Sequence, residues 1–254
     1  MMTEEAAAGG LRAGLPPAVV LRAAGEFRVR CPSSVRKGRA PRGHAVLNEA
    51  VTADLSDSPN LSSIRLAGRG LRLRPWDPDS DADVEAWLRG LTDPEFARWN
   101  TPLTPITDRA DARNSLRARA GRAAEGTSVS FLIADAESGA TLGHIGATDV
   151  RYALGAATLG YWVLPEARGQ GVATRALSLV ARWGHHELGL HRLELNHAVG
   201  HEVSCRVAEK CGFRYEGTMR GSVFVAGRRD AFRDAHLHAR LATDPEPESR
   251  PEAP

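Results

Sequence analysis

The stretch from Ala157 to His186, ATLGYWVLPEARGQGVATRALSLVARWGHH, predicts a strand, a glycine turn and a helix in direct succession. Its run from Leu159 to Leu164 is rich in the aromatic and β-branched types that favour strands. Pro165 ends the run, because proline cannot donate to a sheet ladder. After the turn at residues 168–171, apolar side chains recur at mostly helical spacing, at Val172, Leu177, Leu179, Val180 and Trp183. The pattern therefore places a glycine turn at the start of a long helix.

This turn has the properties of an anion-binding loop. The first N–H groups of a helix lack partners within the helix, and glycines let an anion approach them closely. An ordinary tight turn before a surface helix explains the same stretch equally well. Two other phosphate-binding patterns are excluded. A P-loop requires Lys and then Ser or Thr where Val172-Ala173 stand, and a dinucleotide fingerprint requires Gly or Ala at Thr174.

A second motif downstream helps to decide between an ordinary tight turn and an anion-binding loop. Residues 204–217 read SCRVAEKCGFRYEG. The first loop resembles the Arg/Gln-x-x-Gly-x-Gly/Ala signature of the GNAT superfamily of N-acetyltransferases, with Arg168, Gly171 and Ala173 in register. The second block resembles Asn-x-x-Ser…Val-x-x-Lys-x-Gly-Phe-x-x-Glu-Gly, found in the branch that includes the ribosomal-protein N-terminal acetyltransferases. Two motifs in the right order are far more specific than either alone, and the resemblance covers residues 70–242.

The predicted elements follow the order βααβββαβαββ and indicate an α+β protein with a mixed, mostly antiparallel sheet and about four helices. The predicted strands are residues 71–74, 128–134, 141–150, 157–164, 192–196, 213–216 and 231–241. The predicted helices carry residues 84–91, 108–124, 172–186 and 203–210, and residues 96–105 are expected to be a loop. The resemblance implies that the fourth and fifth strands lie parallel and splay apart, and that pantetheine enters the gap.

Composition sets the limits of the domain and its setting. The 254 residues carry 33 basic and 31 acidic side chains, a net charge of +2. This near balance gives no overall positive field that would attract nucleic acids. No apolar run approaches the ~20 residues that cross a bilayer, and no pair of the three cysteines has a metal-site spacing. We expect a cytoplasmic protein that does not enter membranes. Its oligomeric state stays open.

The two ends differ from the middle of the chain. Residues 1–60 lack any sustained period, and we expect a disordered extension there, a GNAT domain at 61–243 and a disordered tail at 244–254. Eight basic residues lie between Leu11 and Gly43, where Glu26 is the only acidic one. A nucleic-acid-binding tail is the functional alternative for that segment, and it would show strongly salt-dependent DNA affinity.

The resemblance implies acetyl-CoA as cosubstrate and assigns its contacts. The pyrophosphate would be held by backbone N–H groups and the helix dipole at Arg168, Gly169, Gln170, Gly171, Val172, Ala173 and Thr174. Backbone groups of Trp162, Val163 and Leu164 would hold pantetheine like an added strand. His201 stands where the motif has asparagine, and imidazole cannot reproduce an amide's paired donor and acceptor.

The resemblance also gives candidate catalytic residues, each with a structural alternative. Ser204 would protonate the leaving thiolate or hold a water that does, or else be a helix N-cap or first-turn residue with a structural hydroxyl. Glu194 is the candidate general base, or else a solvent-facing strand carboxylate, and Asp149 is a weaker candidate. A base matters for a lysine acceptor, whose deprotonation at pH 7 costs about 4.6 kcal/mol, against about 1.4 kcal/mol for an α-amine. Trp99 and Asn100 would line the acceptor pocket, with a plain core tryptophan as the alternative for Trp99.

Histidines gather between residues 185 and 201, with two more at His236 and His238 on one strand face. No set has a recognised ligand spacing, so we expect solvated histidines and no metal. The sequence as a whole predicts an acyl-CoA-dependent N-acyltransferase acting on a primary amine, either a protein N-terminus or a small molecule. A catalytically weak acyl-CoA-binding regulatory module is the alternative, and His201 is its best support.

Overall fold

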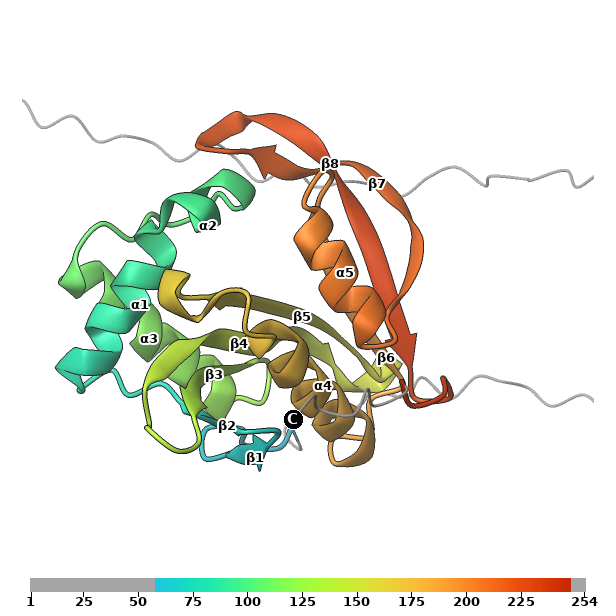
Figure 1. Ribbon diagram of the computed structural model, residues 1–254, viewed down its shortest axis with the longest axis horizontal. Helices are drawn as coiled ribbons and strands as arrows, with labels where there is room; N and C mark the ends of the chain where they lie inside the picture. Colours follow the sequence, from blue (N-terminus) through green and yellow to red (C-terminus); the bar gives the residue numbers. More distant parts are fainter. Residues whose placement is uncertain (1–57, 248–254) are drawn as a thin grey trace, which may run out of the picture. The chain divides into compact units, whose positions relative to one another are not determined.

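The computed structural model describes residues 58–247 (Figure 1). Predictions for residues 1–57 and 248–254 lie outside this part. The strands are β1 (Leu66–Gly68), β2 (Leu71–Pro75), β3 (Val129–Asp135), β4 (Thr141–Arg151), β5 (Ala156–Val163), β6 (Arg192–Ala198), β7 (Arg214–Val225) and β8 (Arg228–Leu241). The helices are α1 (Asp81–Thr92), α2 (Pro94–Trp99), α3 (Arg109–Ala124), α4 (Val172–His186) and α5 (Glu202–Lys210). Short 3₁₀ turns lie at Tyr152–Leu154 and Pro165–Ala167.

All eight of these strands form one sheet, in the order β1-β2-β3-β4-β5-β6-β8-β7. Every neighbouring pair is antiparallel except β5 and β6. These two pair in parallel only from Ala156 opposite Arg192 to Leu159 opposite Leu195. Beyond that point β5 continues against β4 and β6 continues against β8. The predicted splay between the fourth and fifth predicted strands, here β5 and β6, is confirmed.

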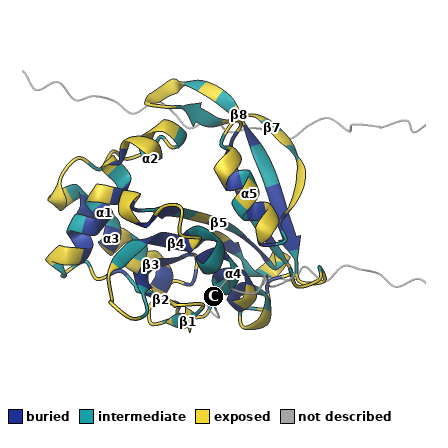
Figure 2. Cartoon of the chain, viewed as in Figure 1, coloured by how far each residue is buried: buried dark blue, intermediate teal, exposed yellow. Residues whose placement is uncertain are grey.

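Helices cover both faces of the sheet, because the central strands are apolar on both sides. In β3, Val129, Phe131 and Ile133 pack into the same core cluster as the apolar side of α4, whereas Leu132 packs into the second cluster, with α1 and α3. This alternation is the two-residue period of a strand. Figure 2 shows the buried stripe of α4 turned to the sheet, while most of β7 is exposed.

Three elements differ from the sequence-based predictions. The expected loop at 96–105 begins in fact with helix α2, which Asp93 caps by accepting from the Phe96 N–H at 3.0 Å. Pro94 suits the first helical position, where no N–H is needed. The strand predicted at 213–216 extends to Val225 as β7, because it pairs along β8, although its exposed side chains show no alternation. Strand β1 and helix α2 are additions, so five helices flank the sheet within residues 58–247.

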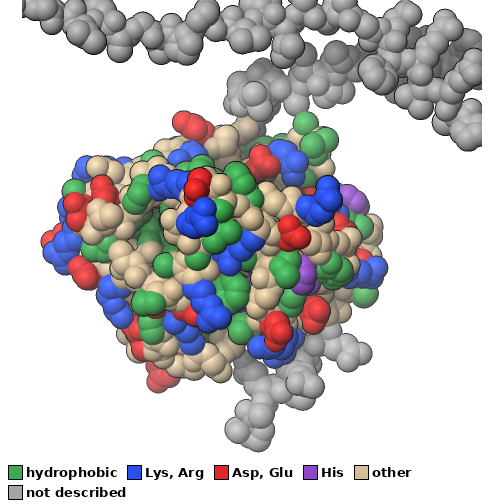
Figure 3. Space-filling view, turned by 90° about the horizontal axis from the view of Figure 1, so that it is seen from above, with side chains coloured by type: hydrophobic (Ala, Val, Ile, Leu, Met, Phe, Trp, Pro, Cys, Tyr) green, Lys and Arg blue, Asp and Glu red, His purple; other side chains and the backbone are tan. Residues whose placement is uncertain are grey.

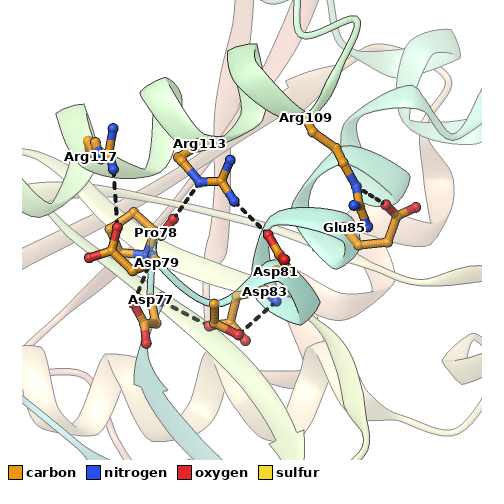
Figure 4. Close-up of polar contacts among 10 residues, drawn as sticks. Asp77, Pro78, Asp79, Asp81, Asp83, Glu85, Arg109, Arg113 and Arg117 are labelled. Atoms are coloured by element: carbon orange, nitrogen blue, oxygen red, sulfur yellow. Dashed lines mark hydrogen bonds and ion pairs between the residues drawn. The ribbon is translucent and has the colours of Figure 1, made fainter.

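Helix α3 is rich in arginine and is joined to α1 and its preceding loop by polar contacts (Figure 4). Arg113 pairs with Asp81 at 2.6 Å and donates to the Pro78 carbonyl at 3.1 Å. Arg117–Asp79 and Arg109–Glu85 are further ion pairs. Exposed pairs of this kind contribute about 0–1 kcal/mol each, so the buried Ala112 and Leu116 supply most of the attachment.

The first residues of the expected tail are ordered. Asp244 accepts from the Leu241 N–H at 2.9 Å and pairs with Arg214 at 2.9 Å. Glu246 pairs with the buried Arg240 at 3.0 Å. These contacts hold Asp244 and Glu246 against β7 and β8, and they satisfy two arginines and the Leu241 N–H.

Gly90 lies inside α1, two residues before the helix ends at Thr92. A Cβ atom at this position would lie 2.3 Å from the ring of Trp162. The indole of Trp162 packs in the aromatic cluster with Trp76, Trp87 and His144. Only glycine therefore lets α1 approach the indole near the end of β5.

We expect Gly90→Ala to lower the free energy of unfolding by about 1–3 kcal/mol, because overpacking must displace Trp162 or α1. Gly121→Ala is the matched control, since Gly121 is an exposed glycine within α3 whose added Cβ would meet nothing within 4 Å. That control should gain up to about 1 kcal/mol from helix propensity. Urea unfolding followed by circular dichroism measures both. The packing explanation for Gly90 fails if both variants change the free energy of unfolding by a similar amount in the same direction.

Candidate functional site

A cavity of about 590 Å³ lies where β5 and β6 part. Its walls are the end of β5, the turn before α4, helix α5 and helix α2. Twelve of the residues predicted from the sequence line it: Trp99, Asn100, Trp162, Val163, Arg168, Gly169, Gly171, Val172, Ala173, Thr174, His201 and Ser204. Leu164, Gln170 and Glu194 do not. The structure thus brings together segments that are up to 105 residues apart, from Trp99 to Ser204.

The glycine turn leaves the start of α4 open to the cavity. Gly169 and Gly171 have φ of 77° and 70°, the left-handed region in which other residues are strained. A Cβ at either would meet nothing within 4 Å, so the space before the turn is empty of protein. Gly171 is the N-cap of α4, and no side chain caps this helix. The first N–H groups of α4 therefore face the cavity with their partial positive charge.

The end of β5 presents a free backbone edge to the same cavity. The Leu164 N–H donates to the Leu142 carbonyl on the β4 side at 2.9 Å. Because backbone groups alternate along a strand, those of Tyr161 and Val163 point the opposite way, toward the gap. Leu164 is buried in the aromatic core and does not line the cavity. Tyr161 and Val163 are therefore the positions from which this edge can bond an extended ligand.

Arg168 holds the cavity wall together. Its Nε donates to the Val163 carbonyl at 3.1 Å, and its guanidinium pairs with Asp93 at 2.5 Å. Asp93 also caps α2, so one arginine ties β5, the turn and α2 to each other. Gln170 turns back and donates to the Glu166 carbonyl at 2.9 Å. The resemblance implies that backbone N–H groups of Arg168 and Gln170 contact the coenzyme, and the side chains of both residues shape the turn.

Ser204 forms the one side-chain hydrogen bond that joins α5 to β5. Its hydroxyl lies 3.0 Å from the Tyr161 hydroxyl, and Ser204 is buried. Ser204 is in the first turn of α5 but is not its cap, because His201 holds that position. Burial raises the pKa of Tyr161 to about 12, with the Ser204 hydrogen bond acting in the opposite direction. Tyr161 is therefore protonated at neutral pH and can donate into the cavity.

His201 and Trp99 form the wall opposite the glycine turn. Their rings stack at a centroid distance of 4.5 Å with an interplanar angle of 4°. Burial lowers the pKa of His201 to about 4, so the ring is neutral at physiological pH. The Trp99 indole N–H donates to Glu95 at 2.7 Å, and Asn100 donates to the Phe96 carbonyl at 3.1 Å.

A second cavity, of about 1000 Å³, lies on the other side of α2 and shares Phe96, Trp99 and Asn100 with the first. The tip of the β7–β8 hairpin closes over this region. Arg233 donates to the Trp99 carbonyl at 2.9 Å, and Thr101 donates to the Val225 carbonyl at 3.2 Å. The residues expected to hold an acceptor, Trp99 and Asn100, therefore line both cavities.

Glu194, the candidate general base, does not line the cavity. It lies in the paired part of β6, opposite Thr158, before the strands part. Its carboxylate pairs with Arg192 at 2.7 Å and with Arg151 at 3.6 Å. Asp149, the weaker candidate, is largely exposed and pairs with Arg151 at 3.2 Å. Neither residue lines the cavity, and the pairing of β5 with β6 continues to Leu195, one residue beyond Glu194.

Nine cavity residues escaped the sequence analysis: Gly90, Glu95, Phe96, Tyr161, Ala167, Val203, Arg206, Val207 and Lys210. The last four stand at the 3–4-residue spacing of one helix face, together with Ser204. That spacing could have placed them beside Ser204. Tyr161 carried no such signal, because alternation along β5 does not tell which edge is free. Arg206 and Lys210 add positive charge to the wall near the glycine turn.

The expectation of solvated histidines is wrong for His197 and His238, which are buried. They lie on β6 and β8 beneath α5, outside the cavity. On the face seen in Figure 3, basic, acidic and apolar side chains are interspersed instead of segregated by sign. Within residues 58–247, no helix has the length and apolarity needed to span a bilayer.

Comparison with known proteins agrees with this geometry. A model of the acetyltransferase (GNAT) domain matches residues 70–214. The probable N-acetyltransferase YjcK of Bacillus subtilis is 40% identical over 78 residues, which are 31% of this chain and 43% of that protein. The match therefore spans less than half the length of this curated relative.

Solved structures extend the likeness over the domain. RimJ of Mycobacterium smegmatis, in complex with CoA-disulfide, is 26% identical over 70% of this chain and 86% of that chain, with a TM-score of 0.61. RimL, a ribosomal L7/L12 α-N-protein acetyltransferase solved with coenzyme A, shares the fold at 18% identity, with a TM-score of 0.63 over 70% and 98% of the two chains. The chain belongs to the GNAT acetyltransferase-domain family.

Proposed function

We propose that this protein transfers an acetyl group from acetyl-CoA to a primary amine, with a protein N-terminal α-amine as the preferred acceptor. The observation that carries the proposal is one cavity that joins an uncapped helix N-terminus to a free strand edge. These are the two features that bind a nucleotide pyrophosphate and an extended amide chain. Two structural neighbours, RimJ and RimL, were solved with coenzyme A or its disulfide, which supports the choice of cosubstrate.

Acetyl-CoA would supply the activated acyl group as a thioester, and this chain would supply alignment and charge stabilisation. The N–H groups at residues 172–174 would face the pyrophosphate, with Arg206 and Lys210 close to the same wall. The free N–H of Val163 would face the thioester carbonyl. A donor in such a place stabilises negative charge on the oxygen, an effect of about 3 kcal/mol in measured cases.

The Ser204–Tyr161 pair would donate a hydrogen bond to the departing sulfur. A phenol with a pKa of about 12 does not fully transfer its proton to a thiolate, whose conjugate acid has a pKa near 8.5. A hydrogen bond that strengthens as charge develops still lowers the barrier. Water can then complete the protonation.

The cavities favour an α-amine over a lysine. The carboxylates that line them are Glu95, which accepts from Trp99, and Asp111, which accepts from Thr107. Neutral His201, with its pKa of about 4, is a poor base at pH 7. Without a free base, the about 4.6 kcal/mol needed to deprotonate lysine weighs heavily, whereas an α-amine needs about 1.4 kcal/mol. The α-N-acetyltransferase RimL shares the fold.

Free thiols at Cys205 and Cys211 fit a reducing cytoplasm.

The proposal is tested by thiol release from acetyl-CoA in the presence of matched peptides. One peptide has a free N-terminus and no lysine, and the other has a blocked N-terminus and one lysine. We expect turnover with the first, rising about tenfold per pH unit below the amine pKa of about 8, and little with the second. Mass spectrometry locates the acetyl group. Tight acetyl-CoA binding without turnover on any amine would favour the regulatory module instead.

Gly171→Glu should raise the coenzyme dissociation constant tenfold or more, because a carboxylate would repel the pyrophosphate and fill the space before α4. Gly189→Glu is the matched control, since Gly189 also has a left-handed φ, of 65°, and open space, but lies outside the cavity. Isothermal titration with coenzyme A compares the two. Similar affinities in both folded variants would remove the glycine turn from the site.

Ser204→Ala and Tyr161→Phe should each reduce kcat more than they weaken coenzyme binding, because the hydroxyl pair acts on charge that develops during transfer. The double variant should lose little beyond the larger single effect, since each hydroxyl orients the other. Steady-state kinetics with the N-terminal peptide gives both constants. If kcat is unchanged and only stability falls, the pair is a packing contact between α5 and β5.

A further inference from the structure

Three histidines and one cysteine meet beneath α5, although the sequence spreads them over 42 residues from His197 to His238. His197 on β6 lies directly opposite His236 on β8. His238 is two residues further along β8 and therefore shares the face of His236. Cys205 projects from α5 onto this face. One potential ligand atom from each of the four lies within 4.8 Å of all the others.

The thiol is the centre of this cluster. Cys205 Sγ lies 3.4 Å from His197 Nε2 and 3.3 Å from His236 Nδ1. Rings of His197 and His238 stack at 5.3 Å, and the rings of His197 and His236 meet edge-on at 5.6 Å. A thiol has one proton and can satisfy one imidazole nitrogen. The single thiol proton therefore cannot be donated to both His197 and His236.

His238 is the member of the cluster whose hydrogen-bonding groups are least satisfied. It is 0% exposed, and neither of its ring nitrogens has a hydrogen-bond partner. Burying an imidazole without partners costs free energy that a solvated or bonded ring would not. His197, in contrast, has its Nδ1 held at 3.1 Å from the Ala198 carbonyl. This contact fixes the Nδ1–H tautomer and leaves the lone pair of Nε2 facing the thiol, the arrangement common for a metal-ligating histidine.

A bound cation would displace the thiol proton of Cys205 to solvent as the metal–sulfur bond forms.

We propose that His197, Cys205, His236 and His238 form a binding site for a zinc ion. Three imidazole nitrogens and one thiolate match the tetrahedral N/S ligand sets of Zn²⁺ and exclude Mg²⁺ or Ca²⁺, which take oxygen ligands. Four protein ligands fill a tetrahedral shell and leave no open position for substrate. The site is therefore structural, and it is independent of the acyl-transfer proposal.

Such a site would fix α5 to the half-sheet of β6 and β8. Ser204 precedes Cys205 directly, and His201 touches His197 with ring centroids 5.9 Å apart. Metal binding would thus set the position of the helix that carries Ser204 and lines the cavity. Its removal is expected to loosen α5 and not to abolish the fold, since Ala208, Cys211 and Phe213 still pack in the main core.

The test uses the full chain, purified without a histidine tag and measured for metal content by inductively coupled plasma mass spectrometry. We expect one zinc per chain, or uptake of one equivalent after dialysis against Zn²⁺, with a rise in Tm. Replacement by Co²⁺ should give the intense visible bands of a tetrahedral site and a thiolate-to-cobalt charge-transfer band.

Cys205→Ala should abolish the charge-transfer band, and His238→Gln should lower Zn²⁺ affinity at least tenfold. His236→Gln serves as a second ligand variant at a less buried position, should His238→Gln fail to fold. Cys211→Ala and His186→Gln are the matched controls, because they remove a thiol and an imidazole outside the cluster and should keep the bands. The proposal is overturned if Zn²⁺ leaves the Tm of the wild-type protein unchanged and the Co²⁺ spectrum is that of the free ion. It is equally overturned if Cys205→Ala retains the thiolate band.

Discussion

The early end of the parallel pairing between β5 and β6 is the constraint on which the site depends. After Leu159 and Leu195 the two strands keep their other partners, β4 and β8, but lose each other. Backbone groups that would be bonded inside a continuous sheet are left facing a gap. Helix α4, which connects the two strands, begins at the same gap, so its uncapped N-terminus points to the free edge. One interruption in pairing thus creates both halves of the proposed coenzyme site.

Two devices keep β5 in place after it has lost its partner. The indole of Trp162 is wedged into the aromatic cluster on the α1 side, where Gly90 gives it room. Arg168 binds the Val163 carbonyl and Asp93, which joins the strand end to α2. The strand end is therefore rigid without a neighbour on one edge. A preorganised edge of this kind loses little conformational entropy when a ligand binds to it.

Much of this arrangement could be predicted from local pattern. The strand, glycine turn and helix at 157–186 follow from proline, glycine and apolar spacing, and the splay followed from the family resemblance. The residues that were missed depend on topology. Tyr161 meets Ser204 only because of where the parallel pairing of β5 and β6 stops. Helix α2 was missed because six residues are too few to show a repeating apolar pattern of helical spacing. Asp93 and Pro94 were nevertheless signals of a helix start.

The histidine cluster illustrates the same limit. The spacing of these residues along the chain does not reveal that His197 lies beside His238. The antiparallel register of β6 and β8 and the crossing of α5 create that contact. Spacing rules detect metal sites whose ligands come from one hairpin or helix, and they miss sites assembled across a sheet. Buried polar atoms without partners are the signal that remains, and they are visible only in three dimensions.

The central claim is that backbone amides at the splay hold the coenzyme, and amide hydrogen exchange tests it most directly. With saturating acetyl-CoA, exchange should slow at residues 169–174 and at Tyr161 and Val163, while the paired strands β2, β3 and β8 remain unchanged. Unaltered exchange at these positions under conditions where binding is complete, or protection confined to another face of the domain, would contradict it.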